Sequence, residues 1–122
     1  MKNLLILSVL TIILFSCKKS SASSSGNNST VVKYQINTSQ QYATGSYYTA
    51  DRYNLGFSSG PSLQWNITIP VTTPFSANLV LLVTQNDTAT LSILVNNSVV
   101  KTQTFINPYL ADSTCQISYT IN

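Results

Sequence analysis

The 122-residue sequence contains no histidine and no glutamate, and charged residues make up only 7% of it. Its three carboxylate side chains, Asp51, Asp87 and Asp112, lie far apart along the chain. General acid and base catalysis near neutral pH mostly uses histidine or a carboxylate with a shifted pKa, so this composition lacks the groups that most hydrolytic mechanisms require. We therefore expect a protein that is not an enzyme.

Cysteine is also scarce, with only Cys17 and Cys115 in the whole sequence. Two cysteines and dispersed aspartates do not supply the ligands of a zinc site. A calcium site around Asp51 or Asp87 stays open, although neither segment has the alternating Asp/Asn spacing of a dedicated calcium loop. We expect neither a metal nor another cofactor.

Basic residues are few beyond the N-terminal region. From residue 31 onward, the three cations Lys33, Arg52 and Lys101 are balanced by the three aspartates. Binding nucleic acid requires a concentrated Lys/Arg surface that neutralises phosphates. Nucleic acid is therefore not an expected partner, and the sequence leaves the oligomeric state open.

The N-terminus has the layout of an export signal. Lys2 precedes a largely apolar run from residue 4 to residue 15. The run is shorter than the roughly 18 to 20 residues that a helix needs to cross the hydrocarbon core of a bilayer. It ends in Leu14-Phe15-Ser16-Cys17, which resembles the bacterial lipobox, although Phe15 is bulkier than is usual at its position. The resemblance implies that residues 1–16 are a lipoprotein signal peptide, removed before a lipidated Cys17.

Lipidation of Cys17 would anchor the protein to a membrane, since two or three acyl chains bind stably where one binds only marginally. This role leaves Cys115 without a disulfide partner in the chain. The residue after the anchor is Lys18 rather than Asp, which by the sorting rule of enteric bacteria implies the outer membrane; the periplasmic and external faces both stay open. Residues 17–30 are Ser-rich and predict a flexible linker that spans on the order of 20 Å. Residues 31–122 form the predicted folded domain.

The domain alternates apolar and polar residues with a period of two, over residues 32–36, 63–69 and 114–121, which is typical of half-buried strands. Residues 77–84 alternate less cleanly and predict a central strand that is covered on both faces. In the last strand Cys115 belongs to the apolar row, so we expect a buried, inert thiol. About seven strands and no helical stretch predict an all-β fold, a small immunoglobulin-like antiparallel β-sandwich.

Asn96-Asn97 joins two apolar segments, residues 89–95 and 98–102. Asparagine tolerates positive φ, which a two-residue type I′ turn requires at both central positions, so these segments predict a hairpin. The predicted register pairs Val95 with Ser98, Leu94 with Val99, Ile93 with Val100 and Leu91 with Thr102.

Tyrosines cluster between the first predicted strand and Gly60, and they include the adjacent pair Tyr47 and Tyr48. Adjacent strand residues point to opposite faces, so one of this pair is expected in the core and the other outside. An exposed tyrosine can stack on a sugar ring or anchor a protein partner, although strand tyrosines also simply cover sheets. The candidate binding residues are Tyr47, Tyr48 and Tyr53.

Four segments match a known pattern over most of the domain: Val32-Lys33-Tyr34-Gln35-Ile36, Leu63-Gln64-Trp65-Asn66-Ile67, Thr84-Gln85-Asn86-Asp87, and the hairpin from Leu91 to Lys101. In these the domain resembles the MmpS-like proteins, small β-sandwich envelope proteins, and especially their lipoprotein relatives in Bacteroidetes-type bacteria. In that family the hairpin turn is Asn-Gly, where this chain has Asn97, and the closing Gly-Thr element is present only as Ser118-Tyr119-Thr120.

Mycobacterial members of that family are accessory partners of large membrane transporters that move lipids and siderophores. The resemblance therefore implies a membrane-anchored, non-enzymatic interaction module that is accessory to an envelope transporter. The alternative is a surface glycan-binding lipoprotein that uses exposed tyrosines.

Overall fold

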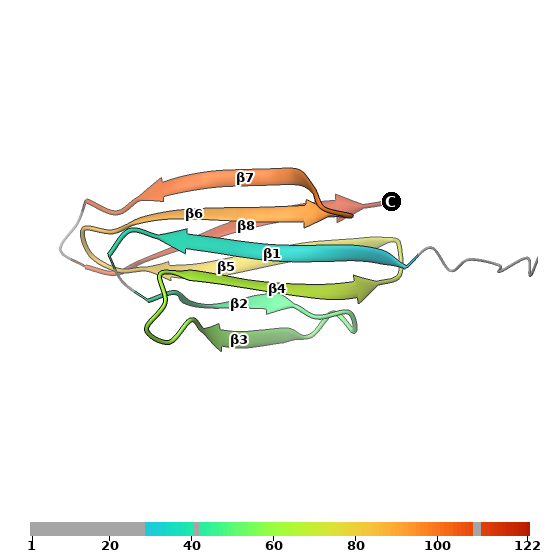
Figure 1. The fold of residues 1–122 in the computed structure, drawn as a ribbon, viewed down its shortest axis with the longest axis horizontal. Coiled ribbons are helices and arrows are strands. Elements are labelled where there is room, and N and C mark those ends of the chain that lie inside the picture. Colours follow the sequence, from blue (N-terminus) through green and yellow to red (C-terminus); the bar gives the residue numbers. More distant parts are fainter. Residues whose placement is uncertain (1–28, 41, 109–110) are drawn as a thin grey trace, which may run out of the picture.

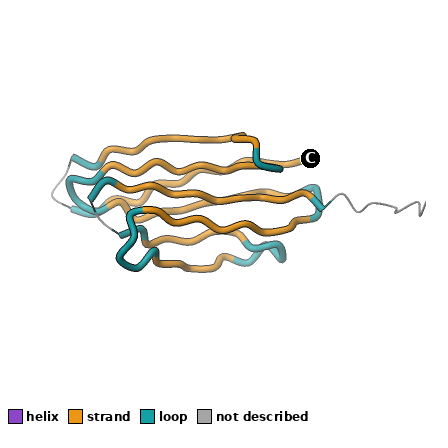
Figure 2. The backbone as a smooth tube through the Cα atoms, in the orientation of Figure 1, coloured by secondary structure: helices purple, strands orange, loops and turns teal. Residues whose placement is uncertain are grey.

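A computed structural model describes residues 29–40, 42–108 and 111–122. The predicted signal peptide, Cys17 and nearly all of the predicted linker lie outside these residues. Within them the chain forms strands and no helix (Figures 1 and 2). The strands are β1 (Thr30–Thr38), β2 (Thr44–Tyr48), β3 (Asn54–Ser58), β4 (Gln64–Val71), β5 (Phe75–Val83), β6 (Thr88–Val95), β7 (Ser98–Ile106) and β8 (Ser113–Ile121).

The strands form two antiparallel four-stranded sheets, in the orders β4-β1-β6-β7 and β3-β2-β5-β8. The sheets pack face to face around one core, which confirms the predicted β-sandwich (Figure 1). The strand total is eight rather than about seven, because the tyrosine-rich segment folds into the β2–β3 hairpin. These two strands have five residues each, and Gly45 and Gly56 weaken the alternation that would reveal them in the sequence.

The core is built from the inward rows of both sheets. Its largest fully buried side chains include Tyr34 and Ile36 of β1 with Leu79 and Leu81 of β5. Burying side chains of this size contributes about 1.5 to 3 kcal/mol each relative to leaving them exposed. Cys115 is part of this cluster, as its place in the apolar row predicted.

Strand β5 lies inside its sheet, between β2 and β8, as predicted for a central strand. The expectation that it is covered on both faces is wrong. Val80 is only half-buried and Leu82 is 39% exposed. The reason is that a two-layer sandwich covers one face of each sheet and leaves the other to solvent.

The β6–β7 hairpin has positive φ values at both turn residues, 48° at Asn96 and 67° at Asn97, as a type I′ turn requires. Its register is as predicted only next to the turn, where Val95 pairs with Ser98 and Leu94 with Val99. Further out the predicted register is wrong, because a β-bulge adds one residue to β7. The observed pairs there are Ile93 with Lys101 and Leu91 with Gln103.

The loops gather at the two ends of the sandwich (Figure 2). We call the end where β1 begins the tether end. There Thr30 pairs with Val71, and an Arg52 guanidinium N–H donates to the Pro74 carbonyl at 2.9 Å, which places the β2–β3 loop at the same end. We call the opposite end, which holds residues 39–40, 42–43, 59–63, 84–87, 107–108 and 111–112, the distal end. No helix that could cross a membrane occurs in the described ranges.

Candidate interaction surface

Four aromatic rings connect the two sheets. The rings of Phe57 and Trp65 stack with their centroids 3.8 Å apart and their planes at 13°. The Tyr47 ring lies between these and Tyr34, with its centroid 5.5 Å from that of Trp65 and 5.3 Å from that of Tyr34. Phe57 belongs to edge strand β3 and Trp65 to edge strand β4, so the rings close the side of the sandwich where both sheets end.

Tyr47 and Tyr48 point to opposite faces of β2, as predicted. Tyr47 is only 4% exposed, so it is a core residue and is not available to a ligand at the surface. Tyr48 is half-buried. Tyr53, in contrast, is 74% exposed in the β2–β3 loop. Tyr47 therefore lies in the core, Tyr48 lies on the opposite face of β2, and Tyr53 lies in the β2–β3 loop. The three candidate residues do not form one binding site.

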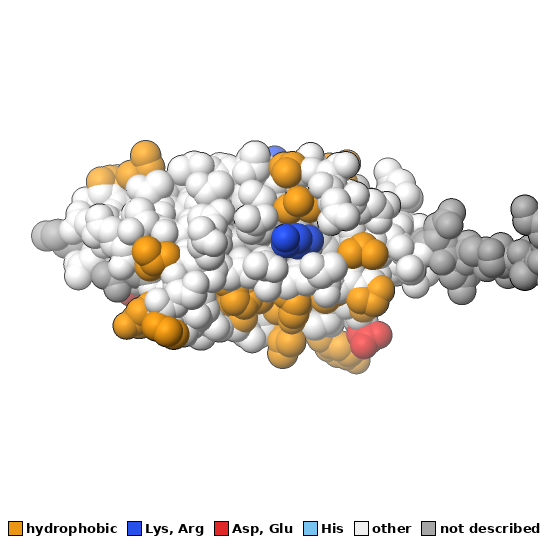
Figure 3. All heavy atoms as spheres, viewed as in Figure 1, with side chains coloured by type: hydrophobic (Ala, Val, Ile, Leu, Met, Phe, Trp, Pro, Cys, Tyr) orange, Lys and Arg blue, Asp and Glu red, His pale blue; other side chains and the backbone are white. Residues whose placement is uncertain are grey.

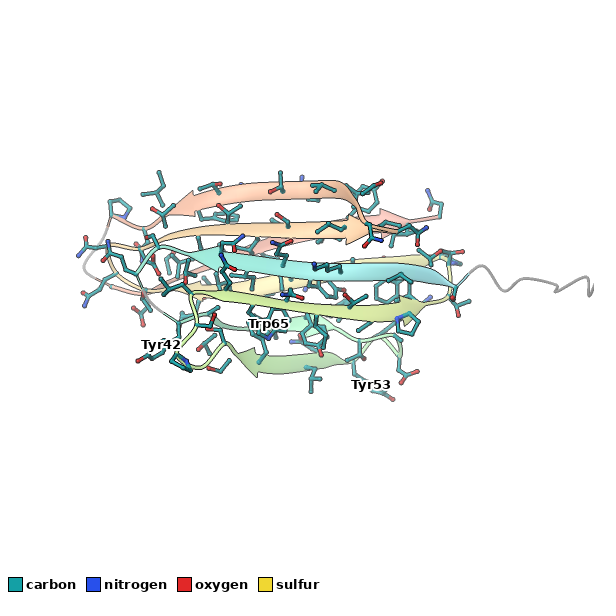
Figure 4. All side chains as sticks on the ribbon, viewed as in Figure 1. Tyr42, Tyr53 and Trp65 are labelled. Carbon is teal, nitrogen blue, oxygen red and sulfur yellow. The ribbon has the colours of Figure 1, made fainter. Side chains whose placement is uncertain are left out.

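Among the described residues, Tyr42 is the other strongly exposed tyrosine, and it is not one of the candidate binding residues. Figure 4 shows it at the distal end, with Tyr53 at the tether end and Trp65 between them. Its side chain is 60% exposed. The tyrosine-rich segment thus presents one ring at each end of the sandwich.

The Tyr34 hydroxyl links the sheets. It donates to the Tyr48 carbonyl at 3.0 Å and accepts a hydrogen bond from the Asn78 backbone N–H at 3.4 Å. Burial raises the pKa of Tyr34 to about 12; the Asn78 hydrogen bond acts in the opposite direction and the nearby Tyr47 adds to the increase. The phenol therefore stays neutral and holds the two layers in register.

Asp87 organises the distal end from a buried position. Its Oδ1 accepts hydrogen bonds from the backbone N–H groups of Ser39 and Gln40 at 3.0 Å each, from Thr88 N–H at 2.7 Å, and from the Ser39 hydroxyl at 2.6 Å. Burial alone would raise the pKa of Asp87, but these hydrogen bonds outweigh it, and the pKa is lowered. The ionised carboxylate fixes the start of the β1–β2 loop against the start of β6.

Asn107 fixes the other distal loops in the same way. Its side-chain amide donates to the carbonyls of Val83, Thr84 and Ala111, and its backbone N–H donates to the Asp87 carbonyl at 2.9 Å. Asn107 and Asp87 are both almost completely buried. The β1–β2, β5–β6 and β7–β8 loops are thus connected by one buried polar network, and such networks rigidify the segments that they join.

Three large apolar side chains are exposed on the loops and strand ends of the distal end. We call Tyr42, Leu63 and Ile106 the distal surface; each is a large hydrophobic residue that remains exposed, and Ile106 is 72% exposed. Each lies next to a fixed backbone: Ala43 N–H donates to the Ser59 hydroxyl, Thr38 N–H donates to the Leu63 carbonyl, and Ile106 precedes Asn107. Rigid loops with exposed apolar groups are a common form of binding surface on β-sandwiches.

Within the part of the chain that the structure describes, the free thiol is that of Cys115, and it is buried. Burial raises its pKa to about 11, so the thiol is protonated at neutral pH. Among the described residues, no three His, Cys, Asp or Glu side chains gather in a way that could hold a metal ion. Asp87, one of the two aspartates considered for calcium, uses Oδ1 as an acceptor for protein N–H and O–H groups, while Asp51 is exposed in the β2–β3 loop.

No model of a known protein family matches this chain, and a search of curated proteins also finds no match. The resemblance to the MmpS-like proteins therefore stays a prediction from the sequence.

Proposed function

We propose that this protein is a lipid-anchored, non-enzymatic interaction module that presents the distal surface to a partner in the cell envelope. The observation that carries the proposal is the division of the sandwich into two ends. The chain enters β1 at the tether end, and the loops fixed by Asp87 and Asn107 lie at the opposite end. An anchor at Cys17 would leave that opposite end free to meet a partner.

The chemistry of the distal surface suits a protein partner. Interface hot spots are typically large, rigid side chains that lose their contact with water on binding. Tyr42 supplies an aromatic ring with few rotatable bonds, and the fixed loops reduce the entropy that binding would otherwise cost. The resemblance to transporter accessory proteins favours a membrane transporter or another envelope protein as that partner.

Site-specific photocrosslinking in native membranes tests this proposal. A photoreactive phenylalanine analogue at position 42 keeps an aromatic ring at the distal surface, and the matched control carries it at Thr102, which is exposed on an outer sheet face. We expect position 42 to yield one defined membrane-protein adduct and position 102 to yield none. Equal yields at the two positions, or no adduct at position 42, would contradict the proposal.

Glycan binding is the second candidate, and one observation favours it. The outer face of the β4-β1-β6-β7 sheet carries two complete cross-strand rows of uncharged amide and hydroxyl side chains, Gln64-Asn37-Thr90-Thr104 and Asn66-Gln35-Ser92-Thr102. Such groups can exchange hydrogen bonds with sugar hydroxyls. On a glycan array, binding that falls in Gln35→Ala but not in Tyr42→Ala would support this candidate over the first.

A further inference from the structure

We propose that the tether end is a docking surface for an anionic lipid bilayer, so that the sandwich stands on the membrane with its distal surface facing away. The docking surface consists of Arg52, Tyr53 and Leu55. This inference rests on the proposed anchor at Cys17, but it concerns the orientation of the domain, which an anchor alone does not determine.

The position of the tether is the first reason. The predicted linker between Cys17 and Thr30 would span on the order of 20 Å as a coil. It joins the domain beside Val71, and the Arg52 hydrogen bond to Pro74 holds the β2–β3 loop at the same end. A short tether of this kind gives an effective concentration on the order of millimolar. Even a weak contact between this loop and the bilayer would therefore be populated.

The shape of the loop is the second reason. Thr49 N–H donates to the Tyr53 carbonyl and Arg52 N–H donates to the Thr49 carbonyl, both at 2.8 Å, and Tyr53 N–H donates to the Thr49 hydroxyl at 3.2 Å. These bonds close the turn and present the Tyr53 ring outward. Figure 4 shows this ring on the β3 side of the molecule, in the half where the chain enters β1.

The chemistry of the exposed groups is the third reason. Tyrosine is enriched where a membrane meets water, because its ring is apolar and its hydroxyl remains hydrated. Leu55, which follows on β3, is 50% exposed and adds an apolar side chain. In the space-filling view, hydrophobic side chains gather along the β3 and β4 side towards the tether end (Figure 3).

The distribution of charge is the fourth reason. Every Lys and Arg of the described residues lies in the tether half: Arg52 is in the β2–β3 loop, and Lys33 and Lys101 are each the fourth residue of a nine-residue strand that starts at this end. Of the aspartates, Asp87 and Asp112 lie in distal loops and only Asp51 lies at the tether end. An anionic surface attracts the basic half and repels the acidic one.

The test uses the full-length lipidated protein in vesicles of phosphatidylcholine and phosphatidylglycerol that contain headgroup-labelled quencher lipid. An environment-sensitive fluorophore is attached to a single introduced cysteine, Ala50→Cys at the tether end or Gln85→Cys at the distal end, both exposed positions. Cys115 is buried, so we expect that it does not compete for the label. We expect several-fold stronger quenching at position 50 than at position 85.

Matched tyrosine variants separate docking from simple tethering. Tyr53→Ser should reduce the quenching at position 50, whereas Tyr42→Ser, which removes the exposed ring at the other end, should leave it unchanged. Equal quenching at positions 50 and 85, or no effect of Tyr53→Ser, would overturn the docking proposal while the protein still floats with the vesicles. Loss of flotation in the wild-type protein would instead overturn the anchor itself.

Discussion

Cys115 shows how its surroundings decide the chemistry of a single residue. Its thiol is buried, its pKa is raised to about 11, and the sequence contains no histidine that could accept its proton. Because the thiolate is the reactive form, we expect slow reaction with maleimide in the native protein and fast reaction after denaturation. Rapid labelling of the native protein would mean that β8 presents its other face to the core.

Substitutions at the same position should separate packing from charge. Cys115→Ala should keep the fold and lower the free energy of unfolding by about 1 kcal/mol, because it leaves only a small cavity. Cys115→Asp should be far more destabilising, since a carboxylate would have to be buried without a partner or protonated. Chemical denaturation of the two variants measures the difference.

Gly45 is required by a close approach between strands. A Cβ at this position would collide with the Val80 carbonyl oxygen and lie 3.1 Å from Cζ of Phe57. We expect Gly45→Ala to lower the free energy of unfolding by roughly 1 to 3 kcal/mol, as overpacking usually does. Gly56→Ala is the matched control on the neighbouring strand, because its Cβ would meet only the Gly45 carbonyl oxygen at 3.7 Å. Equal urea midpoints for the two variants would count against this explanation.

Among the elements, the strands with regular alternation and the Asn96-Asn97 turn were predictable, whereas the β-bulge in β7 and the β2–β3 hairpin were not. The pairs of Val95 with Ser98 and of Leu94 with Val99 follow from the Asn96-Asn97 turn. The bulge could not be predicted, because adjacent apolar residues at the start of β7 fit either register. The β2–β3 hairpin was missed as a hairpin because its strands are short and interrupted by glycine.

The candidate site was less predictable than the fold. Tyr47 and Tyr48 were correctly assigned to opposite faces, but which of them is buried depends on the register of β2 against β5, and that register follows from long-range packing. The distal network was not predicted at all. Asn107-Pro108 indicates a turn in the sequence, yet the three carbonyls that the Asn107 amide binds come from the end of β5, the β5–β6 loop and the β7–β8 loop.

The distal loops should lose stability in acid, because the pKa of the Asp87 carboxyl group is lowered in the folded protein. The stabilisation from ionised Asp87 is complete above the ordinary carboxyl pKa of 3.8 and is lost as the pH falls through the lower folded-state value. The Asp87→Asn variant has no ionisable group at this position. The difference in free energy of unfolding between the wild type and this variant should therefore be largest at neutral pH and should shrink below about pH 4. Thermal unfolding from pH 7 to pH 2 measures this difference, and a constant gap would contradict the role of the charge.

For the whole molecule, the two ends of the sandwich have different compositions. The tether end carries Arg52 and Tyr53, and the distal end carries Tyr42 with two of the three aspartates. A β-sandwich separates its loops into two groups by construction, so one end can face a membrane while the other meets a partner. The roles proposed for the two ends are therefore compatible, and both depend on the proposed membrane anchor at Cys17.

Mass spectrometry of the protein, after metabolic labelling of the cells with a fatty-acid analogue, tests that anchor most directly. We predict a mature chain that begins at Cys17, carries the label and is recovered with membranes. The Cys17→Ser variant should carry no label and should either leave the membrane fraction or keep residues 1–16. Unchanged labelling in Cys17→Ser, or an unlabelled wild-type chain that begins at another residue, would contradict the account.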